Sequence, residues 1–428
     1  MVKVVIVGAG PAGIFAAINL KNKNNEVYLL DKNDSIGKKL AITGNGRCNI
    51  TNIASYKDFL DNIIRNKEFM YSSFSRFDNY SLIDFLEKNN IQTIVEDQGR
   101  VFPKSMKAED IISLFEKKLK DKGVKFLKNT RLISVSKDRD FKLITNRGEL
   151  DADYLVLATG GKSYPKTGSN GDGYRIAKSL GHNITSLLPS LTPLYFTDNF
   201  DIKALNLKDI CLYAKTDKST YVERGDLLLT SHFLTGPTAL KIQARTLRED
   251  IEELWIDLFP DYKESDIEDT IIKIIDKNPK KNISNAIQEL VNESLGSNIL
   301  KRENIALNKK ANQLKKDQRK SLIKSLKKLS FTYIDNSSFT NAVITSGGID
   351  LKEINPKTME SKLVDGLYFA GEILDVDGLT GGFNLQIAFT TGYAASLAIK
   401  ERIWHTLLHL MDLVGLVSLR LQKKFQKN

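Results

Sequence analysis

A glycine-rich turn near the N-terminus constrains the fold more than any other feature of this sequence. Residues 2–7 (VKVVIV) are apolar and β-branched, as in a buried strand, and residues 12–20 (AGIFAAINL) follow the turn with helical spacing. A second apolar run, EVYLL, occupies residues 26–30. The order of strand, turn, helix and strand predicts a βαβ unit in a parallel sheet.

The glycines of this turn have the spacing of a dinucleotide-binding loop. Gly8, Gly10 and Gly13 form GxGxxG directly after the strand and at the start of the helix. The first glycine permits a tight turn, the second lets the backbone approach a pyrophosphate, and the third allows close packing of helix on strand. Asp31 lies at the end of the second strand, where a carboxylate can accept the ribose hydroxyl hydrogens. The alternative interpretation of Asp31 is an ordinary surface carboxylate.

A second strand, glycine-rich turn and helix lie near the other end of the chain. The buried run GLYFA at 366–370 precedes Gly371 and Glu372, and a helix is expected over 384–398. A nicotinamide dehydrogenase needs only the first unit, so the second favours FAD over NAD. In FAD folds a late acidic residue meets the ribityl chain and a helix N-terminus faces the flavin pyrimidine, roles that fit Glu372 and the amides of residues 382–384.

The remaining pattern predicts a discontinuous architecture. Residues 125–135 and 141–145 resemble a hairpin, and residues 153–158 resemble another buried strand. After residue 190 short alternating segments predict an antiparallel β region that is interrupted by long charged helices. We expect an α/β protein with these parts: an FAD-binding domain at 1–190 and 342–402, an inserted β domain at 191–255 and 329–341, a helical insertion at 256–328 and an amphipathic tail at 403–428.

Further motifs stand at residues 39–52 (KLAITGNGRCNITN), 99–103 (GRVFP), 158–173, 347–348 and 371–372. Together they resemble those of the bacterial aminoacetone-oxidase-like FAD-binding flavoproteins, NAD(P)/FAD-dependent oxidoreductases that include a bile-acid dehydroxylation flavoprotein. The resemblance covers roughly residues 1–400. It implies a Rossmann-like FAD domain with a β-barrel insertion that carries a helical bundle, and an oxidase or reductase activity.

The motifs and the resemblance together give a candidate FAD site. Two positions depart from the family pattern, since Asn45 replaces a glycine and Asp31 replaces the more common Glu. No His or Cys lies in a recognisable flavinylation motif, so noncovalent FAD is expected. The expected cofactor-binding residues are Gly8, Gly10, Ala12, Gly13, Asp31, Lys32, Lys39, Gly44, Arg47, Cys48, Asn49, Ile133, Ala158, Thr159, Gly160, Gly161, Gly371, Glu372, Gly382, Phe383 and Asn384.

Three side chains are weighed for a part in catalysis. A guanidinium at Arg47 could stabilise anionic flavin or substrate oxygens, or it could form an ion pair that holds its loop. The family tends to place a histidine directly after Thr230, where this chain has Ser231. If that histidine takes part in chemistry, its geometry is shifted or its role moves to His232, whereas a lone histidine is more often a hydrogen-bonded structural residue. Cys48 could be a redox partner, but a packed small side chain fits better because no second thiol lies near it in sequence.

These features predict two-electron hydride transfer through FAD, with NAD(P)H as a transient donor and an enone-like, imine-like or oxygen acceptor. We expect a small-molecule substrate. The net charge is +11, and residues 301–328 hold eleven Lys or Arg against two acids. This basic run leaves an alternative open, a flavin-dependent enzyme that modifies nucleic acid such as tRNA, or a nucleic-acid binder. A flavin-containing structural or regulatory protein without turnover is a third alternative.

The remaining composition bears on location and assembly. The N-terminus lacks the basic flank and cleavage site of a secretory signal, so a cytoplasmic protein is expected. Two distant cysteines and four histidines give neither a disulfide framework nor a metal-ligand cluster. The tail after residue 402 alternates leucines and valines with polar residues. An amphipathic helix there could pack on the protein or in a homodimer, on a partner, or on a membrane surface.

Overall fold

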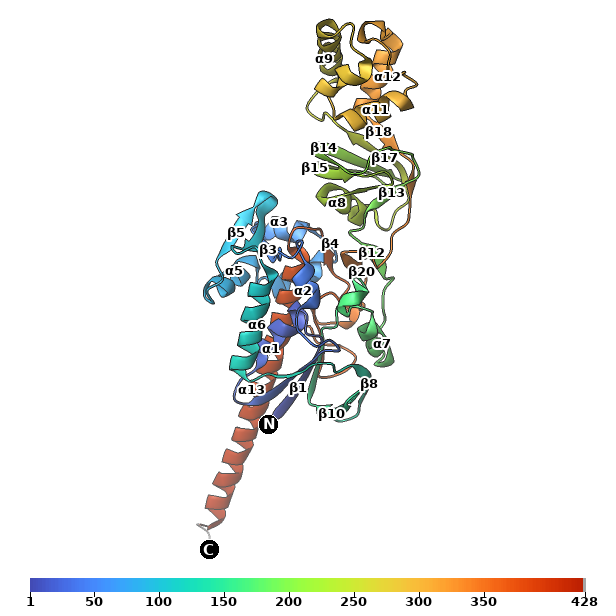
Figure 1. Ribbon diagram of the computed structural model, residues 1–428. Coiled ribbons are helices and arrows are strands. Elements are labelled where there is room, and N and C mark those ends of the chain that lie inside the picture. Colours follow the sequence, from blue (N-terminus) through green and yellow to red (C-terminus); the bar gives the residue numbers. More distant parts are fainter. Residues whose placement is uncertain (426–428) are drawn as a thin grey trace. The chain divides into compact units, whose positions relative to one another are not determined.

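The computed structural model describes residues 1–425, and the side chains up to residue 407 (Figure 1). The chain forms two compact units. Unit 1 comprises Met1–Leu188 and the chain from Ile344 onward, and unit 2 comprises Pro189–Val343. The two ends of the chain therefore build one unit, and the middle of the chain builds the other.

The centre of unit 1 is a five-stranded parallel sheet. Its order is β21 (Leu367–Phe369), β11 (Tyr154–Leu157), β1 (Val2–Val7), β2 (Asn25–Leu30) and β7 (Lys125–Leu127). The apolar side chains of β1 are buried from Val4 to Val7, as expected for a strand covered on both faces. This sheet confirms the Rossmann-like α/β fold, and β21 comes from the second end of the chain.

Two helices from opposite ends of the chain pack together in unit 1. α1 (Pro11–Leu20) contacts α13 (Phe383–Phe425), and the Phe15 ring of α1 lies 5.3 Å from the Phe389 ring of α13. Gly392 makes this approach possible, because a Cβ there would lie 2.3 Å from the Ala12 carbonyl oxygen. Gly392 thus allows the first turn of α1 to pack closely against α13.

The hairpin predicted over 125–135 and 141–145 is partly wrong. Residues 125–127 form β7, which joins the parallel sheet beside β2. The hairpin consists of β8 (Leu132–Lys137) and β9 (Phe141–Thr145). β10 (Gly148–Ala152) pairs with β9, and the three strands form an antiparallel sheet of their own. A strand of three residues carries too little alternation to show which sheet it joins.

Smaller elements complete unit 1. Its short strands are β3 (Thr51–Asn52), β4 (Ile63–Arg65), β5 (Thr93–Glu96), β6 (Arg100–Pro103), β20 (Ile344–Ser346) and β22 (Asp377–Gly378), and β12 (Leu188–Ser190) lies at the boundary. Its other helices are α2 (Lys38–Ile42), α3 (Tyr56–Asp61), α4 (Tyr71–Phe74), α5 (Asn79–Glu87), α6 (Ala108–Lys122) and α7 (Asp172–Ser179).

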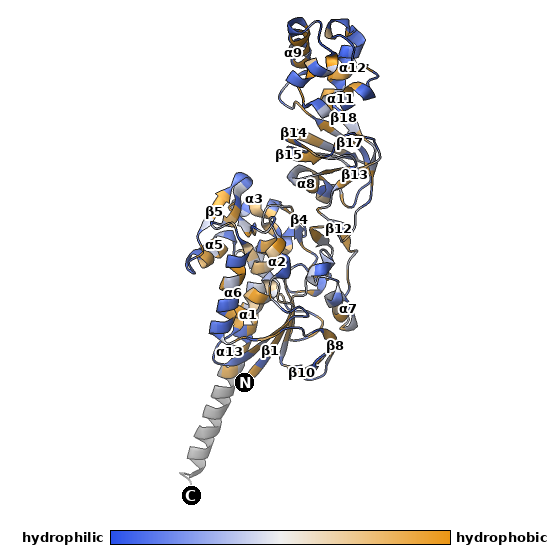
Figure 2. Cartoon of the chain, viewed as in Figure 1, coloured by the Kyte–Doolittle hydropathy of each residue, from blue (hydrophilic) through white to orange (hydrophobic). Residues whose placement is uncertain are grey.

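Unit 2 is a seven-stranded antiparallel half-barrel whose helices are inserted between its strands along the chain. The strands, in sheet order, are β18 (Leu329–Phe331), β17 (Ile251–Asp257), β14 (Leu205–Thr216), β15 (Thr220–Leu229), β16 (Phe233–Thr235), β13 (Leu194–Phe196) and β19 (Tyr333–Ile334). The helices are α8 (Pro237–Thr246), α9 (Glu264–Lys277), α10 (Ile283–Ala286), α11 (Glu293–Arg302) and α12 (Lys316–Lys327). Apolar and polar residues alternate along α9 and α12 (Figure 2). Their apolar faces belong to one continuous core with the sheet.

The last helix is longer than the pattern predicts. A helix was expected over 384–398, whereas α13 runs from Phe383 to Phe425. The side chains of the predicted amphipathic tail from residue 408 onward lie outside the described residues. Within the part of the chain that the structure describes, no helix is long and apolar enough to cross a membrane.

Candidate functional site

The three glycines of the first turn differ in what surrounds them. A Cβ on Gly8, whose φ is +108°, would lie 2.3 Å from the Ala158 carbonyl oxygen, and a Cβ on Gly13 would lie 1.9 Å from the Gly8 oxygen. Gly10 has no atom within 4 Å of its added Cβ. Gly8 and Gly13 therefore serve packing, while Gly10 borders open space at the N-terminus of α1, where amide groups attract phosphate.

Asp31 lies at the end of β2 and faces the same turn. Its carboxylate accepts a hydrogen bond from the Ala9 amide at 2.7 Å and another from the Asn33 amide at 2.8 Å. Lys32 points to the start of α7, where its ammonium is 3.0 Å from the Asp172 carboxylate. Ile133 on β8 is exposed, and its main-chain oxygen accepts a hydrogen bond from the Arg175 side chain. The side expected to hold the ribose thus consists of residues from three separate segments.

The turn after β11 lies between the first glycine loop and the late segment. Ala158 donates its amide to the Val7 carbonyl at 2.8 Å, which continues the parallel sheet. The buried hydroxyl of Thr159 has no hydrogen-bond partner among the described residues. A Cβ on Gly161 would lie 2.4 Å from the Thr345 hydroxyl oxygen, while Gly160 has a positive φ of 72°. The turn therefore needs glycine at both positions.

Glu372 accepts hydrogen bonds from three parts of unit 1. Its Oε2 is 2.7 Å from the Lys39 ammonium, and its Oε1 accepts from the Ser163 hydroxyl and from the Thr345 amide, both at 2.8 Å. Lys39 also donates to the Ser163 hydroxyl at 2.7 Å. Gly371 sits against Ala12, since a Cβ there would lie 2.8 Å from the Ala12 Cβ. Sequence reasoning predicted Lys39 and Glu372 but assigned no role to Ser163 or Thr345.

The loop after α2 contains a run of left-handed residues. Gly44, Asn45, Gly46 and Cys48 have φ values of 57°, 57°, 81° and 60°. Asn45 can replace the glycine of the family pattern because asparagine tolerates this conformation better than most residues. Cys48 is fully buried, and burial raises the pKa of its thiol to about 12. A thiol with that pKa is not a nucleophile near neutral pH, so the structure favours a packed side chain.

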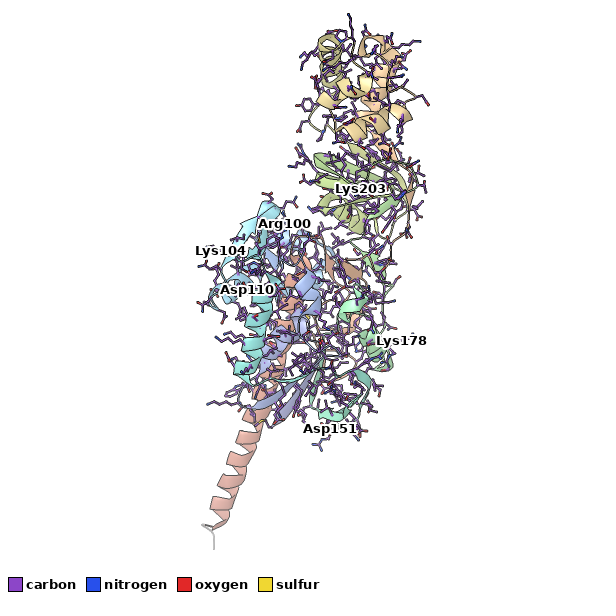
Figure 3. All side chains as sticks on the ribbon, viewed as in Figure 1. Arg100, Lys104, Asp110, Asp151, Lys178 and Lys203 are labelled. Atoms are coloured by element: carbon purple, nitrogen blue, oxygen red, sulfur yellow. The ribbon has the colours of Figure 1, made fainter. Side chains whose placement is uncertain are left out.

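Arg47 is engaged in holding this loop. Its guanidinium lies 2.9 Å from the Glu96 carboxylate of β5 and stacks 4.6 Å from the centre of the Phe102 ring of β6. Arg100, labelled in Figure 3, lies 5.9 Å from the same ring. Of the two roles considered for Arg47, the geometry supports the ion pair.

The turn before α13 meets the same loop. When the Asn49 amide is oriented to satisfy both of its partners, its oxygen accepts from the Gly382 amide at 3.2 Å. The Thr51 hydroxyl donates to the Gln386 side chain at 2.8 Å. Phe383 is the first residue of α13, and the Asn384 side chain bonds both backbone groups of Gly378. Residues 382–384 thus stand at a helix N-terminus, where the sequence predicts them.

A buried charged cluster lies beside the late turn and was missed by sequence reasoning. The Asp375 carboxylate is 2.7 Å from Arg65 Nη2, and the main-chain oxygen of Asp375 accepts a hydrogen bond from the Asn66 side chain at 2.6 Å. Asp377 accepts from the Ser346 hydroxyl at 3.0 Å. Asp375 and Asp377 belong to the run DVDG at 375–378, and no sequence motif links this run to Arg65. This cluster fixes the position of the segment that follows Glu372.

His232 belongs to unit 2 and His182 to unit 1. His232 is exposed in the turn between β15 and β16 of unit 2, and its main-chain oxygen accepts from the Phe196 amide at 3.1 Å. His182 is buried in unit 1 between the Glu353 carboxylate and the Ser361 hydroxyl, each 2.9 Å from a ring nitrogen, and burial lowers its pKa. In the described part of the chain no group of three or more His, Cys, Asp or Glu side chains is placed to hold a metal ion.

The residues of unit 1 fit a dinucleotide cofactor. The open space at Gly10 lets phosphate approach the amides at the start of α1, and a side chain there would fill that space. The Thr159 hydroxyl is a buried polar atom without a partner in the described structure. Lys39, Ser163 and Glu372 add charged and hydroxyl groups that could bond a ribityl chain.

Comparisons with known proteins agree with this geometry. A family model described as the HI0933-like protein Rossmann domain matches residues 2–398. A 3-dehydro-bile acid delta(4,6)-reductase of Clostridium scindens is 30% identical over 94% of this chain and 100% of that protein. The ribosomal RNA dihydrouridine synthases of Haemophilus influenzae and Escherichia coli are 29% and 28% identical, over 93% and 92% of this chain and 98% and 96% of those proteins. The chain belongs to the HI0933-like Rossmann-domain family and is an FAD-binding oxidoreductase.

Proposed function

We propose that this protein uses noncovalent FAD to reduce a carbon–carbon double bond conjugated with a carbonyl group, with NAD(P)H as the electron donor. The observation that supports the proposal is the contact of Lys39 with Glu372, because it brings charged groups from both ends of the chain to one place where they could bind a cofactor. NAD(P)H is oxidised by two electrons, the double bond gains the equivalent of one hydride from it, and water supplies the proton. We place this reaction in the cytoplasm.

The residues of unit 1 have separate roles in this proposal. The amides after Gly10 hold the pyrophosphate, Asp31 binds the ribose, and Glu372 with Lys39 orients the ribityl chain. The dipole at the N-terminus of α13 would stabilise negative charge on the flavin pyrimidine. Bound FAD supplies two-electron hydride transfer.

The names of the relatives support the class of acceptor. One relative is a reductase of a 3-dehydro bile acid and two are synthases of dihydrouridine in ribosomal RNA. A steroid enone and a uracil ring share a double bond conjugated with a carbonyl carbon. A small enone is the first candidate substrate. A uracil base in RNA is the second, and the basic run at 301–328 favours it.

The test combines flavin release with turnover. Heat precipitation of the purified protein should release FAD into the supernatant, whereas flavin left in the pellet would indicate a covalent link. Anaerobic NADH and NADPH should each be tested for bleaching the flavin absorbance, followed by addition of 2-cyclohexenone, a 3-keto-4-ene steroid or a uridine-containing RNA transcript. Reoxidation by at least one of these acceptors with formation of the saturated product is expected. Bleaching by neither nicotinamide, or reoxidation by oxygen alone, would refute the proposal.

A further inference from the structure

Charge is strongly segregated within unit 2. Residues 301–328 hold eleven basic and two acidic side chains, while the rest of residues 189–343 holds thirteen basic and twenty acidic ones. The unit as a whole is close to neutral, so its basic charge is concentrated in one segment. Such a patch produces a local positive field that attracts polyanions.

Ion pairs account for only part of this basic segment. Arg319 pairs with Glu268 of α9, Lys327 with Asp257 of β17, and Lys328 with Glu253 of the same strand. These contacts tie α12 to its own unit. They leave the basic side chains on the outer side of α12 for other partners.

Three lysines form a row on the outer side of α12. Lys316, Lys320 and Lys324 are exposed and have no carboxylate within ion-pair distance in the described structure. They are spaced four residues apart, so they share one helix face at intervals of about 6 Å. Leu322, Ile323 and Leu326 point to the core of unit 2 instead.

We propose that this row of Lys316, Lys320 and Lys324 docks the phosphate backbone of an RNA substrate, an inference that rests on the second candidate of the proposed function. Ammonium groups without acidic partners release counterions when they meet phosphates. A membrane surface fits less well, because a helix that binds in the interface needs exposed apolar residues beside its lysines, and the apolar residues of α12 are buried.

The experiment compares two triple variants of the full-length holoprotein. K316Q/K320Q/K324Q removes the row, and K117Q/K120Q/K122Q removes three exposed lysines of α6 in unit 1, the helix that carries Asp110 in Figure 3. Binding of a fluorescein-labelled structured ribosomal RNA fragment is measured by fluorescence anisotropy at KCl concentrations from about 50 to about 300 mM, which gives the salt dependence of the affinity. The α12 variant should bind at least about ten-fold more weakly, with a salt slope lower by about 2 to 3, and the α6 variant should match the wild type.

Two further measurements separate the possible outcomes. NADPH-driven reduction of a small enone and the flavin content should be equal in all three proteins, so a loss confined to RNA binding supports the inference. Equal RNA affinity and salt slope in the α12 variant and the wild type would overturn the inference, as would a wild type that binds no RNA. In either case, turnover of the small enone would still support the proposed reductase function. Loss of binding to phosphatidylserine vesicles without loss of RNA binding would also overturn it.

Discussion

The ammonium of Lys39 lies 2.7 Å from the carboxylate of Glu372, although 333 residues separate them in the chain. Both side chains are about one-fifth exposed, which strengthens their attraction relative to a pair in bulk water. Ser163 donates a hydrogen bond to the same carboxylate and accepts one from the same ammonium. The pair therefore joins the early signature loop, the turn after β11 and the late turn at one point.

Removal of the Glu372 charge should weaken FAD binding without unfolding the protein. Glu372→Gln keeps the size of the side chain but leaves the Lys39 ammonium without its anionic partner. We expect about ten-fold weaker FAD binding, which corresponds to ~1–2 kcal/mol. Lys39→Met and the double variant complete a cycle whose coupling energy measures the pair. Affinity is measured by fluorescence titration of the apoprotein.

An exposed acid of the same unit provides the control. Glu116 lies on the outer face of α6, so Glu116→Gln should retain the affinity of the wild type. If Glu372→Gln and Glu116→Gln bound FAD equally well, Glu372 would have no role at the cofactor and the junction between the chain ends would be purely structural.

Gly10 and Gly13 should fail in different ways when they gain a side chain. Gly10→Val places its side chain in open space, so the apoprotein should keep its stability within about 0.5 kcal/mol while FAD binding is lost. Gly13→Ala puts a Cβ 1.9 Å from the Gly8 carbonyl oxygen, and helix and strand must separate at a cost of about 1–3 kcal/mol or more. Urea unfolding of both apoproteins, with flavin content after purification, distinguishes them. Full flavin content in Gly10→Val would show that phosphate does not approach there.

The sequence predicts the parallel sheet well because its signals are local. The runs at β1 and β2 are continuous apolar stretches, and the glycine turn between them has a known geometric purpose. The prediction that Glu372 belongs with the N-terminal loop relied on a second glycine-rich unit and on the family resemblance. Neither source could identify Thr345, whose backbone amide, not its side-chain type, bonds Glu372.

Elements that depend on distant partners were harder to predict. The antiparallel region expected after residue 190 contains the long strands β14 and β15, whose exposed side chains are mostly polar, so their full length is harder to predict than that of a continuous apolar run. The Arg65–Asp375 pair is invisible in sequence, since it joins residues 310 positions apart with no motif around Arg65. The role of Arg47 was open for the same reason, because Glu96 and Phe102 become its neighbours only in the fold.

Burial of the Cys48 thiol should make stability depend on pH. Its pKa is raised from 9.0 to about 12 in the fold, so the unfolded chain loses this proton first as the pH rises. The contribution of the neutral thiol is complete below pH 9 and is lost between pH 9 and 12, by about 1.4 kcal/mol per pH unit. Urea unfolding under reducing conditions at pH 8 and pH 10 should therefore show wild type losing more stability than Cys48→Ala, by about 1.4 kcal/mol. Equal losses would mean that the thiol is not buried.

The buried pair of Arg65 and Asp375 should matter more than an exposed pair nearby. The Asp375 side chain is only 4% exposed, so Arg65→Met leaves a carboxylate without its counter-charge in a poorly hydrated place, at a cost of about 3–5 kcal/mol. Lys67 lies two residues after Arg65 and forms an exposed ion pair with Asp61. Lys67→Met breaks this pair and should leave the unfolding free energy unchanged within error. Asp375→Asn in the Arg65→Met background removes the orphaned charge and should recover part of the loss. A similar unfolding free energy for Arg65→Met and Lys67→Met would show that water reaches Asp375, and that the late turn is held by its backbone hydrogen bonds alone.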